Sequence, residues 1–193
     1  MYTESLVFKA AKRLSGRLAA LACVLAFASA PTMASAQGVE TVEARVGIVE
    51  PLAITKLSDL DFGNIIPSTG GTIVLTPTVS PTCTVTGAVI HTAECQPATF
   101  GGFGAAGQRV RVRRPIGRQI VLTGPGDDMT VTDITIDGDP DLTLVRSNPN
   151  WERFLIGSSD GAFVFRVGGT LTVNPDQAPG VYTGTFDIRL DYQ

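Results

Sequence analysis

Short runs in which apolar and polar residues alternate recur along most of the chain. In residues 109–113 (RVRVR), arginine and valine alternate strictly, and residues 129–136 approach the same pattern. Alternation with a period of two predicts a half-buried β-strand. After residue 36, apolar residues nowhere recur at helical spacing over three turns. We therefore expect strands at residues 42–48, 52–57, 72–76, 85–90, 109–113, 120–122, 129–136, 142–145, 162–167, 170–173 and 182–192.

Turn-forming residues separate these runs. They lie at residues 124–127 (GPGD), 137–140 (DGDP), 160–161 (DG) and 179–180 (PG). Glycine, proline and aspartate favour tight turns, and short strands joined by such turns are typical of antiparallel all-β domains. We predict an immunoglobulin-like β-sandwich over residues 50–193, with a jelly roll or a small β-barrel as the alternatives.

The first 36 residues have the pattern of a secretory signal peptide. Four basic residues between Lys9 and Arg17 precede an apolar run over residues 18–30, and Ala34-Ser35-Ala36 matches a signal-peptidase site. The apolar run is too short to span a bilayer. We predict cleavage after Ala36, no transmembrane segment in the mature chain, and export to the periplasm, the outer cell surface or a fimbria. Lipidation at Cys23 and a retained anchor are the weaker alternatives.

The charge balance narrows the classes of partner. The formal charge is −3, and removing residues 1–36 takes away four basic residues and one acidic residue, so that the mature chain carries −6. An exported, acidic chain with this apolar content is neither a nucleic-acid-binding protein nor a disordered one.

Two cysteines remain after cleavage. Cys83 and Cys95 form an even pair in a chain predicted to be exported, which indicates a disulfide bond. His91 lies between them, but two cysteines and one histidine are an incomplete zinc-ligand set. We expect no metal at this position and no cofactor.

Two further motifs receive a structural interpretation. Residues 157–161 (GSSDG) match G-x-S-x-G, but the only histidine lies upstream and a strand follows, so we interpret the motif as a hairpin loop and expect no enzyme. Asp137, Asp139 and Asp141 resemble half of an EF-hand loop without its later ligands. We interpret them as an acidic turn and leave calcium binding open.

A stripe of arginines occupies one face of a predicted strand. Arg109, Arg111 and Arg113 alternate with Val110 and Val112, so the three guanidinium groups share a side. Such a stripe is a candidate site for an anionic ligand. The alternative is a charged strand that protects a sheet edge from unwanted pairing.

Several segments resemble an exported proteobacterial domain-of-unknown-function family related to the major subunits of Mat/Ecp fimbriae (the common pilus). The similarity begins with residues 52–63 (LAITKLSDLDFG) and ends with residues 177–186 (QAPGVYTGTF). Shorter matches lie at residues 71–75, 129–134 and 167–173. The resemblance implies an exported immunoglobulin-like sandwich in a pilus-subunit-like role, with no catalytic residues to carry over.

Both ends of the mature chain fit that role. Residues 37–49 form either an N-terminal extension or a first strand, and their apolar face of Val42, Ala44, Val46 and Ile48 makes them a candidate donor strand. The C-terminal segment places Phe186, Ile188, Leu190 and Tyr192 on one face as the candidate strand for a chaperone or for assembly. The expected partners are the protein itself, a periplasmic chaperone and an usher. The alternative function is a monomeric secreted binding module for an anionic envelope glycan or another ligand.

Overall fold

A computed structural model describes residues 40–193, so the predicted signal peptide lies outside the described residues. The described chain is built from antiparallel strands and one 3-10 turn, η1 (Ile116–Arg118), with no α-helix among residues 40–193. The strands are β1 (Ala53–Ser58), β2 (Ile65–Ile66), β3 (Gly71–Thr76), β4 (Thr82–Gly87), β5 (Ile90–His91), β6 (Ala98–Phe103), β7 (Arg109–Arg113), β8 (Ile120–Leu122), β9 (Met129–Asp137), β10 (Leu142–Asn148), β11 (Trp151–Ile156), β12 (Ala162–Val173) and β13 (Arg189–Tyr192). The predicted all-β, antiparallel class is confirmed.

The first sheet is organised around β12, its longest strand. The first half of β12 pairs with β6 and its second half pairs with β3, along the same edge of the strand. The opposite edge of β12 pairs with β9. The remaining strands extend the sheet outward: β1 pairs with β6, β4 with β3, and β8 with β9.

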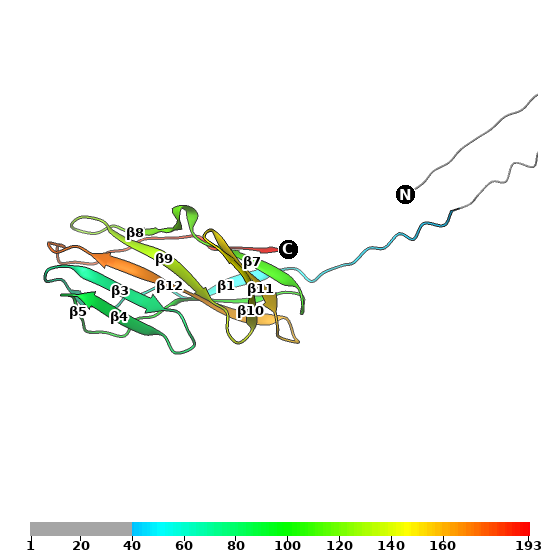
Figure 1. The fold of residues 1–193 in the computed structure, drawn as a ribbon, viewed down its shortest axis with the longest axis horizontal. Coiled ribbons are helices and arrows are strands. Elements are labelled where there is room, and N and C mark those ends of the chain that lie inside the picture. The colour runs from blue at the N-terminus through cyan, green and yellow to red at the C-terminus, as the bar shows by residue number, and fades with distance from the viewer. Residues whose placement is uncertain (1–39) are drawn as a thin grey trace, which may run out of the picture. The chain divides into compact units, whose positions relative to one another are not determined.

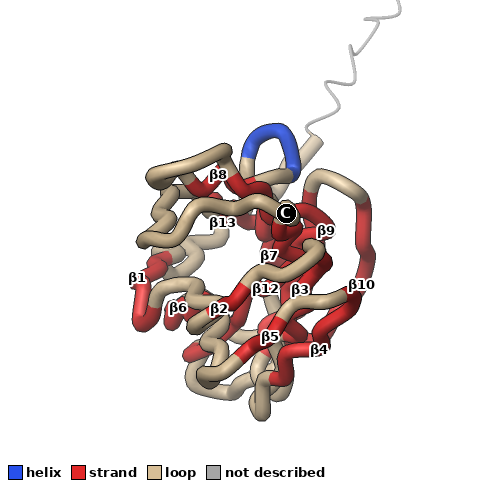
Figure 2. Tube along the Cα trace, turned by 90° about the vertical axis from the view of Figure 1, so that its left-hand side faces the viewer, coloured by secondary structure: helices blue, strands red, loops and turns tan. Residues whose placement is uncertain are grey.

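The second sheet has the order β10-β11-β7-β13, and a small ladder of β2 and β5 completes the domain. Figure 1 shows β7, β10 and β11 in front of part of the first sheet, as the two layers of a sandwich. In the end-on view of Figure 2, β1 lies at the left of the domain and β10 at the right.

The core lies between these sheets and follows the alternation of the strands. Val110 and Val112 of the second sheet and Phe165 of the first have no exposed surface. Phe165 stacks on Phe100 of β6, with ring centroids 5.1 Å apart. The arginines that alternate with the two valines therefore point away from the core.

The two predicted strands at residues 162–167 and 170–173 form the single strand β12. Gly168 and Gly169, which separate them in sequence, are both buried inside it. A Cβ at Gly168 would lie 2.3 Å from the Leu75 carbonyl oxygen, and one at Gly169 would lie 2.8 Å from the Thr132 carbonyl oxygen. Glycine is needed here because the backbones of β3 and β9 approach β12 closely.

The segments at the two ends of the described chain differ from the expected strands. Residues 40–52 contain no strand, and the first strand begins at Ala53. At the other end, β13 covers only Arg189–Tyr192. The expected strand at residues 182–192 is interrupted because the chain changes sheets: Thr183 exchanges two backbone hydrogen bonds with Thr123, just after β8 of the first sheet, whereas β13 pairs with β7 of the second.

Candidate functional site

The arginine stripe lies on an interior strand of the second sheet. β7 carries Arg109, Arg111 and Arg113 and is hydrogen-bonded to β11 on one side and to β13 on the other. A strand with partners on both edges has no free edge to protect, so the edge-protection interpretation is wrong. The three arginines instead belong to a broad outer surface made by four strands.

The register of the sheet extends this surface beyond β7. Arg113 lies opposite Trp151 of β11 and opposite Arg189 of β13. Arg111 lies opposite Arg153, and Arg153 lies opposite Arg146 of β10. We call the whole set the cationic face: Arg109, Arg111, Arg113, Arg146, Arg153, Arg189, Trp151 and Asp191.

One carboxylate and one aromatic ring hold several of these arginines. An Asp191 carboxylate oxygen accepts hydrogen bonds from Arg113 (2.9 Å) and Arg111 (3.3 Å), and these bonds, that from Arg113 foremost, lower the pKa of the Asp191 carboxyl. The guanidinium carbons of Arg153 and Arg146 lie 5.3 and 6.0 Å from the centroid of the Trp151 ring. Both distances are within the range of a cation–π contact.

The sequence alone did not identify Arg146, Trp151, Arg153 and Arg189 as members of this face. They lie on three different strands, and no spacing in the sequence connects them with β7. Only the strand register brings them together. The alternation in residues 151–156 was the available signal, but it was hidden because a glutamate, Glu152, occupies a core-facing position.

Arg114, next to the stripe, has a structural role. Its guanidinium forms an ion pair with Glu152 and donates to the carbonyl oxygens of Ile134 (2.8 Å) and Asn148. Burial raises the pKa of the Glu152 carboxyl, and the positive charge of Arg114 opposes that shift. This buried contact connects β9, β10 and β11 with the residue that follows β7, and it is separate from the cationic face.

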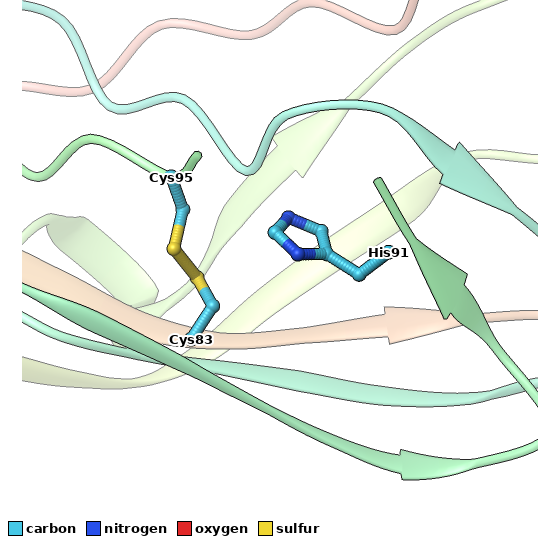
Figure 3. Close-up of side chains that lie close together, drawn as sticks. All are labelled: Cys83, His91 and Cys95. Carbon is cyan, nitrogen blue, oxygen red and sulfur yellow. A yellow bond between two sulfur atoms is a disulfide. The ribbon is translucent and has the colours of Figure 1, made fainter. Parts of the chain in front are cut away.

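The predicted disulfide between Cys83 and Cys95 is present, with the Cα atoms 6.3 Å apart (Figure 3). His91 lies beside it, and its Nε2 donates a hydrogen bond to the Phe62 carbonyl oxygen at 2.7 Å. In the described part of the chain, these three residues are the one group of three side chains placed as metal ligands would be. Because both cysteine sulfur atoms are in the disulfide bond, neither can bind zinc as a thiolate. The His91 imidazole is then the one zinc ligand of the three.

The three aspartates at residues 137–141 have separate roles. Asp137 pairs with Arg166 (3.5 Å), and burial raises its pKa. A carboxylate oxygen of Asp141 accepts the Val164 backbone N–H (3.0 Å), while the Asp139 carbonyl oxygen accepts from Arg166. They do not converge as cation ligands, so the open question of calcium binding receives no support from their geometry.

Residues 157–161 form the turn between β11 and β12, as the sequence predicts. The Ser158 hydroxyl donates to the Ala162 carbonyl oxygen within this turn. The Asp160 carboxylate accepts the Ala162 backbone N–H at 3.2 Å. Both side chains therefore stabilise the turn itself.

The candidate donor and assembly segments have opposite environments. Val42, Val46 and Ile48 are 86%, 90% and 97% exposed, and Ala44 is exposed as well. The four candidate residues of the C-terminal segment are instead half-buried and pack against the core: Phe186, Ile188, Leu190 and Tyr192.

Tyr192 also connects the C-terminal strand with the start of β1. Its hydroxyl donates to the Glu50 carbonyl oxygen and accepts the Ala105 backbone N–H, both at 2.8 Å. The ends of β1 and β13 are therefore close to one another. Among the described residues, β1 pairs only with β6, and β13 only with β7.

No helix in the described chain has the length and apolar character required to cross a membrane. Comparisons with curated proteins and with solved structures found no match. The model of one protein family, described as "Domain of unknown function (DUF4402)", matches residues 52–192. That match covers the whole strand-bearing domain from β1 to β13, and the chain therefore belongs to the DUF4402 family.

Proposed function

We propose that the protein is an exported structural or surface subunit, similar to the subunits of pili or fimbriae, and that it assembles by β-strand addition. In this process residues 37–49 of one copy add as a strand to the sheet of the next copy. The resemblance of residues 52–63 and 177–186 to relatives of Mat/Ecp fimbrial subunits supports the proposal. The observation that carries it is the exposed, alternating segment before β1.

This segment has the side-chain pattern of a strand but no partner strand in the described chain. Its apolar positions are almost fully exposed, and Glu43, Arg45 and Gly47 alternate with them. Burial of Val42, Ala44, Val46 and Ile48 against another copy would contribute roughly 5–8 kcal/mol before the cost of ordering the segment. Strand addition also satisfies the backbone groups of the segment.

The acceptor in our proposal is the free edge of β13. This edge borders a part of the core that is only half-covered, since Phe186, Ile188, Leu190 and Tyr192 all retain exposed surface. An added strand with Val46 and Ile48 facing inward would cover these side chains. Strands at a sheet edge are the usual receptors for an added strand.

Charge also favours this edge. The outward positions of the segment include Glu43 and Arg45, and those of β13 are Arg189 and Asp191. An added strand can therefore place a carboxylate beside Arg189 and a guanidinium beside Asp191. Opposite charges on neighbouring strands stabilise the pairing modestly.

The test compares the oligomers of the exported chain with those of a chain that lacks residues 37–49. We expect unheated samples of the first to show a ladder of oligomers in gel electrophoresis, and the second to lose it. Supplying residues 37–49 as a peptide should fill the acceptor edge of the shortened subunit and raise its thermal stability.

Two single substitutions provide a matched control. Ile48→Asp puts a carboxylate on the face that becomes buried, whereas Gly47→Asp adds the same charge at the neighbouring outward position, where no atom lies within 4 Å of the added Cβ. We expect Ile48→Asp to abolish the ladder and Gly47→Asp to keep it. A wild-type protein that stays monomeric at high concentration beside a periplasmic chaperone and an usher would contradict the proposal and favour the monomeric binding module.

A further inference from the structure

The middle row of the cationic face brings arginines together across three strands. Arg111, Arg153 and Arg146 occupy directly opposed positions on β7, β11 and β10. Neighbouring strands are about 4.8 Å apart, and like charges at opposed positions destabilise a sheet. The domain keeps this arrangement although the mature chain carries a net charge of −6. An anion bound across the row would remove the repulsion.

Asp191 shows that a carboxylate fits between arginines of this face. It stands at the end of the same row, opposite Arg111, and one oxygen of its carboxylate contacts both Arg111 and Arg113. Further along the row, Arg153 and Arg146 have no carboxylate partner in the described chain. Trp151 holds these two guanidinium groups beside one another, which pre-organises them for an incoming ligand.

We propose that the cationic face binds a linear polysaccharide that carries carboxylate groups, lying across the strands from β13 to β10. Its carboxylates continue the row that Asp191 begins and pair with Arg153 and Arg146. Arginine suits this role because its guanidinium group binds a carboxylate in a planar, bidentate geometry. Arg109 and Arg189 flank the row and add to the attraction.

Two other occupants fit the face less well. A lipid bilayer requires a broad apolar surface that inserts. Leu155 and Trp151, the large apolar side chains that point outward from β11, are both half-buried, and β10 adds only Leu144 and Val145 as exposed large apolar residues. A second copy of the chain would have to offer an acidic strand. Its acidic run at residues 137–141 is already engaged, through Asp137 with Arg166 and through Asp141 with a backbone N–H.

This inference does not depend on strand addition. The cationic face is formed within one copy, by residues of β7, β10, β11 and β13. A chain that lacks residues 37–49 still presents it, so binding of the polysaccharide and assembly of oligomers are measured separately. A protein that forms no oligomers could still bind the polysaccharide, and a protein that does not bind it could still assemble.

The experiment measures binding of the exported chain to polygalacturonate, which has a carboxylate on each sugar. The matched ligand is the fully methyl-esterified polymer, which has the same backbone without the charge. Vesicles of phosphatidylglycerol and poly-glutamate represent the other two classes of partner. We expect binding to polygalacturonate that weakens with added salt, and none to the methyl ester.

A pair of double variants tests whether this face is responsible. R146Q/R153Q removes two charges from the row, and K56Q/R118Q removes two exposed charges from β1 and η1, so both chains have the same net charge. R146Q/R153Q removes two charge-assisted contacts with the ligand, so we expect it to bind at least about tenfold more weakly. K56Q/R118Q should bind as the wild type does, and both should retain the wild-type melting temperature within a few degrees.

Several outcomes would overturn the inference. The first is a wild-type protein that does not bind polygalacturonate at low salt. The second is an equal loss of binding in both double variants, which would indicate a general charge effect. The third is tighter binding to phosphatidylglycerol vesicles or to poly-glutamate. The fourth is a salt-sensitive dimer, without any polysaccharide, that R146Q/R153Q abolishes, because the face would then bind a second copy.

Discussion

Asp191 is the residue that balances charge on the cationic face. Its carboxylate accepts from Arg113 and Arg111, and the same contacts keep its pKa below the ordinary value of 3.8. A carboxyl group whose pKa is lowered by folding stabilises the folded state above its unfolded pKa, and this contribution disappears as the pH falls through the folded pKa. We therefore expect the stability of the second sheet to depend on pH through this one carboxyl group.

We predict that Asp191→Asn lowers the melting temperature near neutral pH and that its difference from the wild type shrinks below about pH 4. The effect should stay below about 1 kcal/mol at neutral pH, because the carboxylate is exposed and screened. Thermal unfolding between pH 3 and pH 7 measures it. Asp187→Asn removes an exposed carboxylate on the same segment and serves as the control. A difference that grows in acid would contradict the assignment.

At the scale of elements, the buried ion pair of Arg114 and Glu152 connects the end of β7 with β9, β10 and β11. Arg114 follows β7, Glu152 is on β11, and the carbonyl oxygens that Arg114 contacts belong to β9 and β10. Burial raises the pKa of the Glu152 carboxyl, and the positive charge of Arg114 opposes that shift. A buried ion pair generally adds little net stability, but removing one partner is costly because the other charge stays buried alone.

Glu152→Gln should lower the free energy of unfolding by about 2–4 kcal/mol, because it leaves the charge of Arg114 buried without a counter-ion. Denaturant titration measures the change. Ser147→Ala provides the control, since it removes only the 3.2 Å hydrogen bond to the same carboxylate oxygen and should cost about 1 kcal/mol. Equal stability of Glu152→Gln and the wild type would mean that the ion pair has no structural role.

The disulfide acts on the elements at the other end of the domain, where Cys83 of β4 is bonded to Cys95 before β6. Replacing both cysteines by serine should lower the free energy of unfolding by roughly 2–4 kcal/mol, because the unfolded chain gains conformational freedom. Denaturant unfolding of the variant and of the wild type measures this loss. Reduction of the wild type should produce the same loss, and mass spectrometry of the protein from its native envelope should detect no free thiols.

At the level of elements, sequence patterns predicted the strands whose alternation is regular. The bounds of β7 and β8 agree with the expected residues 109–113 and 120–122. β6 was missed because Gly101 and Gly102 suggest a loop, although Gly102 fits against the ring of Phe163 where a Cβ would lie 2.5 Å from it. β11 was missed because the buried ion pair puts Glu152 where an apolar residue is expected.

For the whole molecule, the sequence identified one strand of the cationic face and could not identify the rest. Strand register is a long-range property, set by backbone pairing between β7, β10, β11 and β13, and no local pattern encodes it. The disulfide, in contrast, was predictable because an even pair of cysteines in a chain predicted to be exported has few alternatives. Likewise, only the strand topology shows that, among residues 40–193, β1 and β13 each have one edge without a partner strand.

The central position of β12 has a consequence for how the protein is made. This strand pairs with β3, β6 and β9, all of which precede it in the chain. β3, β6 and β9 are therefore synthesised before their common partner exists. Such long-range pairing folds slowly and leaves strand edges open to aggregation. The first sheet therefore stays incomplete until β12 is available, wherever in the cell the chain folds.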